Sequence, residues 1–259
     1  NFNEILGGRV KSLRPHIHSG ILGKKNDKNH IKELKKIKVP FIDLVVVNLY
    51  PFENIVNDKN AKRQLCIENI DIGGPSLIRG AAKNYDNVTV LTNPNQYNSF
   101  LDVVESNRNH IPKSFREYCA IAAFEHTSYY DGVISKWFNK KNPNFCDEKL
   151  SLNFKKISQL RYGENPHQRA ALFELKKNPL IKISGKDLSF NNIYDIEIAM
   201  ELAQQFQKSS CVILKHGNPC GVALNKKQHK AFDKALNCDK VSAFGGIIAF
   251  NKKLSLETA

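Results

Sequence analysis

Short apolar segments followed within a few residues by Asn, Gly or Pro constrain the fold of this chain more than any other feature of its sequence. Each segment is rich in Val, Ile or Leu and is shorter than a typical helix, so it predicts a buried strand. The turn-forming residues beside each segment predict points at which the chain leaves the sheet. Four segments have this form, at residues 41–49, 87–92, 211–214 and 241–250.

Helical periodicity separates the first two of these segments and continues after the second. Residues 95–106 and 113–140 predict helices, and Gly73-Gly74-Pro75 before an Ala-rich run predicts a helix start with Pro in its first turn. Alternating β and α segments indicate an α/β domain, a doubly wound parallel sheet with helices on both faces. His126, on the apolar stripe of the second helix, is predicted to be a satisfied core histidine.

A second domain is predicted after residues 141–149, a polar stretch in which helical periodicity stops. We place the linker there, with domains at residues 1–145 and 150–259. The helix expected after Leu188 has Asp195 or a nearby Asn as its predicted cap.

The net charge of +14 is typical of proteins that bind nucleic acids. However, 31 of the 39 basic residues are Lys, whereas a groove that follows phosphates favours clustered Arg and stacking aromatics. The densest basic run, residues 24–38, has apolar residues at helical spacing and predicts a solvated helix face. We therefore predict no nucleic-acid partner, although the charge helps to attract anionic substrates. No apolar run approaches a membrane span, so no membrane partner is predicted.

The cysteine pattern favours a reducing compartment. The chain has six cysteines and no Cys-x-x-Cys pair. This pattern predicts neither a disulfide framework nor a zinc site, and a cytoplasmic protein fits it. The sequence begins at Asn1 without an initiator Met, so we expect the true N-terminus to lie outside it.

Lys215 and His216 follow the apolar segment 211–214 directly, where the predicted strand leaves the sheet. Histidine can take and return a proton near neutral pH, and an adjacent lysine can stabilise a developing oxyanion. Consecutive strand residues point to opposite faces, so the two side chains converge only if the backbone turns. Gly217-Asn218-Pro219 allows such a turn, and we expect it to break the strand. A solvated lysine beside a capped histidine fits the same dipeptide.

Six sequence blocks resemble the bifunctional AICAR transformylase/IMP cyclohydrolase family, and they occur in the family's order. Three blocks in the first half resemble its cyclohydrolase domain and three in the second half resemble its formyl-transfer domain. The blocks are GGRVKSLRPHIHSGIL (7–22), VVVNLYPF (45–52), ENIDIGGPSLIRGAAKN (68–84), RYGENPHQ (161–168), KHGNPCG (215–221) and SAFGGIIAFN (242–251).

The resemblance implies a methylglyoxal-synthase-like domain followed by part of a cytidine-deaminase-like α/β domain. It implies an enzyme of the last two steps of IMP biosynthesis. AICAR receives a formyl group from 10-formyltetrahydrofolate, and the product FAICAR closes its ring with loss of water. The folate is a co-substrate, no metal or redox cofactor is required, and the full-length protein is expected to be a cytoplasmic homodimer.

The resemblance also assigns roles to single residues, and we expect Arg9, Lys11, Ser12, Asn48, Asp71 and Lys83 to share one pocket. The expected catalytic residues are Lys215 and His216 for formyl transfer, and Asp71, Lys83, Tyr50 and Lys11 for ring closure. The expected substrate contacts are Arg9, Val10, Ser12, Val47, Asn48, Ile72, Gly73, Gly74, Arg161, Tyr162, Asn192, Phe244 and Gly245.

The sequence departs from related patterns at two places. Arg14 stands where the family usually has His, which adds charge and removes a neutral imidazole. Pro219-Cys220 lacks the second Cys that zinc deaminases carry in a Pro-Cys-x-x-Cys run, so no zinc is expected.

The matched blocks predict a fragment without the family's N-terminal segment and without the later part of the transformylase domain. We therefore predict no measurable formyl transfer by these 259 residues alone. Two alternatives are a nucleotide-binding remnant without turnover and a basic RNA-binding protein.

Overall fold

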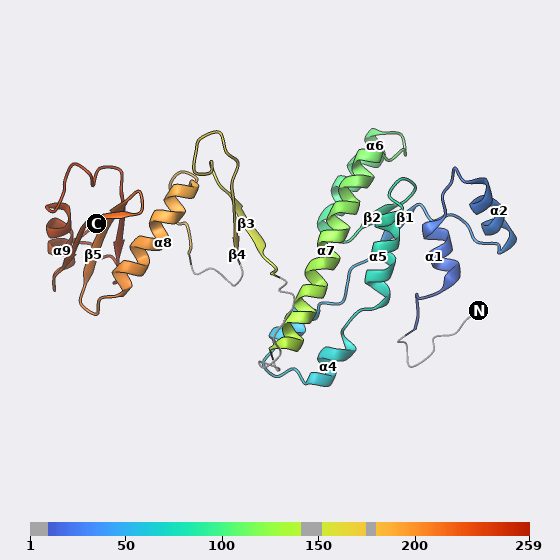
Figure 1. Cartoon of the computed structure of the whole chain (residues 1–259), viewed down its shortest axis with the longest axis horizontal. Helices are drawn as coiled ribbons and strands as arrows, with labels where there is room; N and C mark the ends of the chain where they lie inside the picture. Colours follow the sequence, from blue (N-terminus) through green and yellow to red (C-terminus); the bar gives the residue numbers. More distant parts are fainter. Residues whose placement is uncertain (1–9, 141–151, 175–179) are drawn as a thin grey trace. The chain divides into compact units, whose positions relative to one another are not determined.

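The chain forms two compact units in a computed structural model that describes residues 10–140, 152–174 and 180–259 (Figure 1). Unit 1 spans Asn1–Asn153 and unit 2 spans Phe154–Ala259. The linker predicted at residues 141–149 lies outside the described residues. Each unit has its own core, and we describe each by itself.

Unit 1 is built around two helices, α5 (Gly73–Lys83) and α7 (Lys113–Asn139), which pack against a short parallel strand pair. Ile78 and Ala81 of α5, Val90 of the sheet and Ala123 of α7 belong to one buried apolar cluster. The other elements of unit 1 are α1 (Pro15–Leu22), α2 (Lys28–Lys36), α3 (Phe52–Asn57), α4 (Arg63–Glu68), the 3₁₀ helix η2 (Pro94–Gln96) and α6 (Tyr97–Ser106).

The parallel pair consists of β1 (Leu44–Val46) and β2 (Thr89–Leu91), with Val45 opposite Val90. This pairing confirms an α/β fold with parallel strands, whereas the predicted doubly wound sheet with helices on both faces stays a prediction. The prediction that the first strand is buried is confirmed for Val45, which belongs to the core, and is wrong for the opposite face of β1. Leu44 and Val46 are 39% and 47% exposed, because no described element covers the side of β1 to which they point.

His126 lies on α7 as predicted, but it is not fully satisfied. Its Nε2 is buried and has no hydrogen-bond partner among the described residues. Burial lowers the pKa of this imidazole from its ordinary value, because a charged ring is poorly solvated there.

Unit 2 is centred on an antiparallel sheet in the order β6-β5-β7, in which β5 (Ser210–Lys215) is the middle strand. Val212 and Leu214 pack on α8 (Phe190–Gln204), and Cys211 and Ile213 pack on α9 (Gln228–Leu236). Side chains alternate between the two faces of a strand. A middle strand with a helix on each face therefore needs a continuous apolar run, and the prediction of a buried strand at 211–214 is confirmed.

The remaining strands of unit 2 also pair antiparallel. The strand β6 (Asn218–Leu224) and the strand β7 (Ile247–Phe250) flank β5. Separately, β3 (Lys155–Gln159) pairs with β4 (Ala171–Glu174).

Two predictions about unit 2 need correction. The strand β5 ends at Lys215, close to the predicted break. However, Asn218 and Pro219 belong to the next strand, β6, an edge strand with a register shift opposite Ile213 and Leu214. Proline is tolerated at an edge or an irregularity because it cannot donate to the ladder. The cap of α8 is Ser189, in a capping box with Asn192, and not Asp195.

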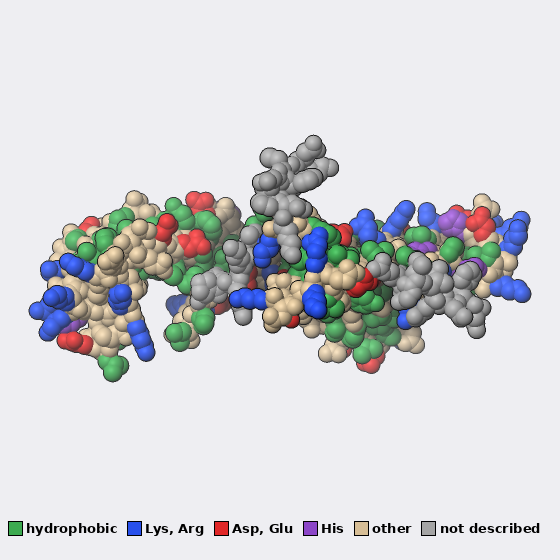
Figure 2. All heavy atoms as spheres, turned by 90° about the horizontal axis from the view of Figure 1, so that it is seen from below, with side chains coloured by type: hydrophobic (Ala, Val, Ile, Leu, Met, Phe, Trp, Pro, Cys, Tyr) green, Lys and Arg blue, Asp and Glu red, His purple; other side chains and the backbone are tan. Residues whose placement is uncertain are grey.

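On one face of the protein, Lys and Arg side chains occur in several separate places (Figure 2). Apolar and neutral side chains lie between them on that face. The basic run at 24–38 contains α2, capped by Asp27, with only Leu34 buried in the helix. Among the described residues, no helix combines the length and the apolar character needed to cross a bilayer.

Candidate functional site

Unit 1 contains an open cavity of about 620 Å³ where the start of α5 meets the loop that follows β1. Lys11 and Ser12 line it from the N-terminal side, Tyr50 from the loop after β1, and Asp71 from the segment before α5. The structure thus gathers predicted residues from three segments of the chain. The full set of predicted residues that line this cavity is Lys11, Ser12, Val47, Tyr50, Asp71, Ile72, Gly73 and Gly74.

The position of Asp71 is fixed from two sides. Its Oδ1 accepts a hydrogen bond from the Gly74 amide at 2.7 Å, and its own amide donates to the Tyr130 hydroxyl at 2.8 Å. The amide of Gly74, at the start of α5, is therefore not free to bind an anion, because an internal carboxylate already accepts its hydrogen bond.

Two glycines allow the segments to approach closely. A Cβ on Gly73 would lie 2.4 Å from Oγ of Ser12, and a Cβ on Gly74 would lie 2.5 Å from Oδ2 of Asp71. Any larger residue would push the Ser12 segment or the Asp71 carboxylate away from the helix start. The Gly-Gly pair is therefore part of the cavity wall for a steric reason.

The structure does not bring all the predicted residues into this cavity. Lys83 lies ten residues beyond Gly73, roughly 15 Å along α5, and lines another cavity with His18 and Arg79. Asn48 donates to the Tyr97 hydroxyl at 3.0 Å and lines a third cavity. Arg9 lies outside the described residues. The predicted single pocket is therefore wrong for Lys83 and Asn48 in this structure.

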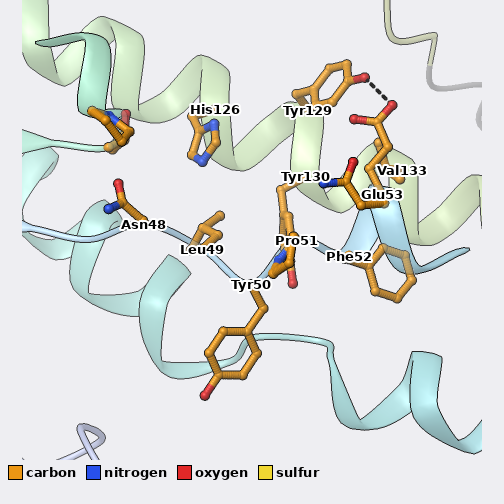
Figure 3. A pocket seen from close by; sticks show the side chains of 13 residues that line it. Asn48, Leu49, Tyr50, Pro51, Phe52, Glu53, His126, Tyr129, Tyr130 and Val133 are labelled. Atoms are coloured by element: carbon orange, nitrogen blue, oxygen red, sulfur yellow. Dashed lines mark hydrogen bonds between the residues drawn. The ribbon is translucent and has the colours of Figure 1, made fainter. Parts of the chain in front are cut away.

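The third cavity, of about 250 Å³, lies between α7 and the loop after β1. In Figure 3, His126 projects from α7 toward Asn48 and Leu49, and Tyr50 points to the opposite side of the loop. The Tyr129 hydroxyl donates to Glu53 at 2.9 Å. Burial, together with that carboxylate, raises the pKa of Tyr129 to about 12, so the phenol stays protonated at neutral pH.

In unit 2, Lys215 and His216 lie at a two-residue hairpin turn between β5 and β6. His216 and Gly217 have φ angles of 53° and 74°, and Lys215 pairs with Asn218. Two successive left-handed residues define a type I′ turn, which favours Asn and Gly rather than His. The predicted backbone turn is present, and both Lys215 and His216 line a cavity of about 370 Å³.

The same cavity is lined by groups from the segment before β7, including Asp239 and Ser242. Hydrogen bonds from the hydroxyl and the amide of Ser242 lower the pKa of the Asp239 carboxyl. The Lys215 Nζ donates to the Phe244 carbonyl at 2.7 Å. An ammonium has three N–H donors, so two remain available to a ligand.

A buried carboxylate supports the turn from α8. Asp195 Oδ1 accepts from the Gly217 amide at 2.8 Å, and Oδ2 accepts from the His216 amide at 3.2 Å. Neither this role of Asp195 nor the presence of Asp239 in the cavity is predicted from the sequence. The signal for Asp195 is an acidic residue among the apolar residues of a helix, which needs a partner when it is buried.

Arg161, Tyr162 and Asn192 are held at the start of α8, apart from the cavity beside His216. The Arg161 guanidinium lies 4.8 Å from the centre of the Tyr162 ring and donates to its hydroxyl at 3.1 Å. This bond, with a second from Ser189, lowers the pKa of the phenol. Asn192 Oδ1 accepts from the amide and the hydroxyl of Ser189, so the structure uses it as a capping residue.

Phe244 and Gly245, two predicted substrate contacts in the loop before β7, are not among the residues that line the cavity beside His216. Phe244 is 84% exposed, and Gly245 has a left-handed φ of 75° with nothing within 4 Å of a Cβ. Among the described residues, no group of three or more His, Cys, Asp or Glu side chains could hold a metal ion. The absence of zinc stays a prediction.

These features define an α/β protein with a lysine and a histidine at a hairpin turn in one unit and a cavity at a helix start in the other. Residues 81–259 match the family model described as AICARFT/IMPCHase bienzyme. The chain belongs to this family, as the six sequence blocks indicated.

Whole-chain relatives agree with the family match. The chain is 46% identical over 272 residues to the "Bifunctional purine biosynthesis protein PurH" of Prochlorococcus marinus strain MIT 9215, which covers 100% of this chain and 52% of the relative. The protein of the same name from Caldicellulosiruptor saccharolyticus is 43% identical over 270 residues, with the same coverage. The chain thus spans about half the length of the curated relatives it matches. A solved structure, "Crystal structure of ForH", is 32% identical and covers 53% of this chain and 70% of its own, with a TM-score of 0.46.

Proposed function

We propose that unit 2 supplies the acid–base residues with which the complete protein transfers a formyl group from 10-formyltetrahydrofolate to the 5-amino group of AICAR. The observation that carries this proposal is the turn that brings Lys215 and His216 to one cavity. A base and a cation side by side suit an acyl transfer, in which a proton leaves the nucleophile while negative charge develops on oxygen.

The steps assign one task to each side chain. The AICAR nitrogen attacks the formyl carbon, and His216 removes a proton from that nitrogen. Lys215 stabilises the oxyanion of the tetrahedral intermediate with the donors that its bond to Phe244 leaves available. The bond from carbon to N10 then breaks, N10 takes up a proton, and tetrahydrofolate leaves.

For unit 1 we propose the ring closure of FAICAR to IMP. The carboxamide nitrogen attacks the formyl carbon, and the oxygen of that group leaves as water. Lys11, Tyr50 and Asp71 line one cavity and supply a cation, a phenol and a carboxylate to move these protons. The resemblance also assigns Lys83 to ring closure. Because Lys83 lines another cavity, it takes part only if the structure rearranges or if the substrate binds outside this cavity.

The proposal includes the finer architecture that the resemblance implies. Unit 1 corresponds to a methylglyoxal-synthase-like domain, and unit 2 to part of a cytidine-deaminase-like domain. Reduced folate, AICAR and FAICAR or IMP are the proposed small-molecule partners, and the proposed assembly is a cytoplasmic homodimer. No metal is assigned to either step.

The direct test measures both reactions with protein expressed from the complete reading frame that encodes these residues. Tetrahydrofolate release with AICAR reports formyl transfer, and IMP formation from FAICAR reports ring closure. We expect His216→Ala to lower the kcat of formyl transfer by about 10²–10⁴-fold, the usual contribution of a general base. His110→Ala, on an exposed position of unit 1, serves as the matched control.

Unchanged formyl transfer in His216→Ala would remove this residue from the mechanism. Binding of AICAR and IMP without either reaction would favour the nucleotide-binding remnant instead. Isothermal titration of the 259-residue chain with AICAR, IMP and a short RNA separates these outcomes from RNA binding.

A further inference from the structure

We propose that Asp195 is a positioning residue for formyl transfer, which holds His216 in place through the backbone of the turn. This inference rests on the function proposed for unit 2. Asp195 does not line the cavity beside His216, so it acts on the reaction only through the turn. Its carboxylate contacts the two amides of His216 and Gly217.

The turn needs such support because its conformation is unfavourable for histidine. His216 has a φ of 53°, in the left-handed region, where the Cβ of an L-residue is crowded by its own backbone. In a type I′ hairpin, the amides of the two central residues point away from the ladder and need another acceptor. The two oxygens of Asp195 accept one amide each, at 3.2 and 2.8 Å. Bonds to an ionised acceptor are stronger than bonds to a neutral one.

The carboxylate itself is held rigidly. Asp195 is 7% exposed and lies on α8, whose residues Ala199 and Ala203 pack against Val212 of β5. The preceding residue, Tyr194, lies so close to Gly217 that a Cβ there would be 2.9 Å from its ring. Helix α8 therefore fixes the turn with a carboxylate and confines it with an aromatic ring.

The consequence for catalysis is geometric. Lys215 remains in the β5 ladder and is anchored to the Phe244 carbonyl, whereas His216 has left the ladder. The position of the imidazole relative to the ammonium then depends on the φ and ψ angles of His216, which the Asp195 carboxylate restrains. A displacement of about 1 Å in a reacting group can lower a rate by about 100-fold.

The test combines kinetics with hydrogen exchange. In the complete-frame protein, we expect Asp195→Asn to lower kcat of formyl transfer by about 10- to 100-fold and to leave KM for AICAR within about threefold. In the His216→Ala background the same substitution should lower kcat no further, because both changes remove one function. In the 259-residue chain, the amides of His216 and Gly217 should exchange at least about tenfold faster, and those of Val212 and Ile213 should not.

Glu197→Gln removes the same charge from an exposed position of α8 and should match the wild type in every measurement. If Asp195→Asn also speeds hydrogen exchange at the amides of Val212 and Ile213, the substitution has disturbed the sheet itself. The variant Asp195→Glu, which keeps the carboxylate, then provides the test. In Asp195→Glu, slow exchange of the His216 and Gly217 amides and a kcat higher than that of Asp195→Asn would then support the proposal. Unchanged kcat in folded Asp195→Asn, or a further loss in the His216→Ala background, would overturn it. Absence of formyl transfer in the wild type would refute the proposed function, while the exchange data still test the role of Asp195 in the turn.

Discussion

Unit 1 and unit 2 build their candidate sites in different ways. In unit 1 the side chains of Lys11, Tyr50 and Asp71 come from three segments that meet at the start of α5. In unit 2 the two residues proposed for acid–base chemistry, Lys215 and His216, are consecutive and lie at one hairpin turn. The first site therefore depends on how segments pack, and the second depends on the backbone angles of two residues.

This difference indicates which substitutions should disturb each site. Packing of three segments tolerates small shifts in any one of them, provided that the glycines at the helix start remain. A left-handed turn has no such tolerance, because each of its residues must keep a conformation that most side chains disfavour. Substitutions in the two units should consequently affect different reactions and for different physical reasons.

The largest expected effect is that a substitution in either unit removes one of the two reactions and leaves the other. His216→Ala should lower formyl transfer by about 10²–10⁴-fold and leave ring closure of FAICAR within about twofold, and Asp71→Asn should do the reverse. The physical reason is that Asp71 lines the cavity of unit 1 and His216 lines the cavity of unit 2, so each proposed acid–base role belongs to one unit. Separate assays with AICAR plus formyl-folate and with FAICAR check this. Equal loss of both activities in either variant would show that the sites are not independent.

The next largest expected effect is a loss of folding free energy when a glycine is replaced by alanine. Gly217→Ala should destabilise unit 2 by about 2–4 kcal/mol, because alanine is strained at a φ of 74° and its Cβ meets the Tyr194 ring. Gly185→Ala is the control, since Gly185 has a φ of 95° but open space around a Cβ, and should cost only about 1 kcal/mol. Gly74→Ala in unit 1 meets crowding without a left-handed φ and should cost about 1–3 kcal/mol.

Urea unfolding of the three alanine variants gives these free energies. Equal costs for Gly217→Ala and Gly185→Ala would show that Tyr194 does not confine the turn.

A smaller effect has the opposite sign. His216→Asn should stabilise unit 2 by about 1 kcal/mol, because asparagine tolerates the left-handed region better than histidine does. The same variant should lose formyl transfer, so stability and activity should change in opposite directions. Thermal unfolding and the tetrahydrofolate assay measure the two. A destabilised His216→Asn protein would mean that the imidazole makes stabilising contacts that outweigh the backbone strain.

The smallest effect is a pH dependence in unit 1. Burial lowers the pKa of His126 below its ordinary value of 6.5, so the unfolded chain binds more protons than the folded one between those two values. Stability should therefore fall as the pH drops through about 6.5, and His126→Gln should reduce that fall. Urea midpoints at about pH 7.5 and pH 5.5 measure it, with His110→Gln as the exposed control. A larger fall in His126→Gln would contradict the assigned sign.

The sequence could predict the local elements of both units, for reasons visible in single residues. The run from Cys211 to Leu214 is apolar at every position because β5 has a helix on each face, and this pattern is readable without a structure. The helix start at Gly73 is likewise encoded by its glycines and by Pro75. The order of the six blocks was enough to indicate the family that the comparisons then showed.

The sequence could not predict which groups meet across space. Asp195 was read as a helix cap because acidic residues are common there, but it lies inside α8 and its carboxylate bonds to amides more than 20 positions along the chain. Lys83 was expected beside Asp71 because the family's matching residues share a reaction, yet the helix separates the two. Both misses concern tertiary distances, which no local pattern encodes.

If each unit carries its own site, AICAR and IMP should bind at different places. Amide chemical-shift mapping of the 259-residue chain measures this. At the lowest ligand concentrations that produce shifts, AICAR should first move the amides of Lys215, His216 and Gly217. IMP should first move those of Ser12, Gly73 and Gly74. Two separate sets of first shifts, one in each unit, are therefore expected. First shifts in the same unit for both ligands, or AICAR shifts that spare the turn at His216, would contradict it.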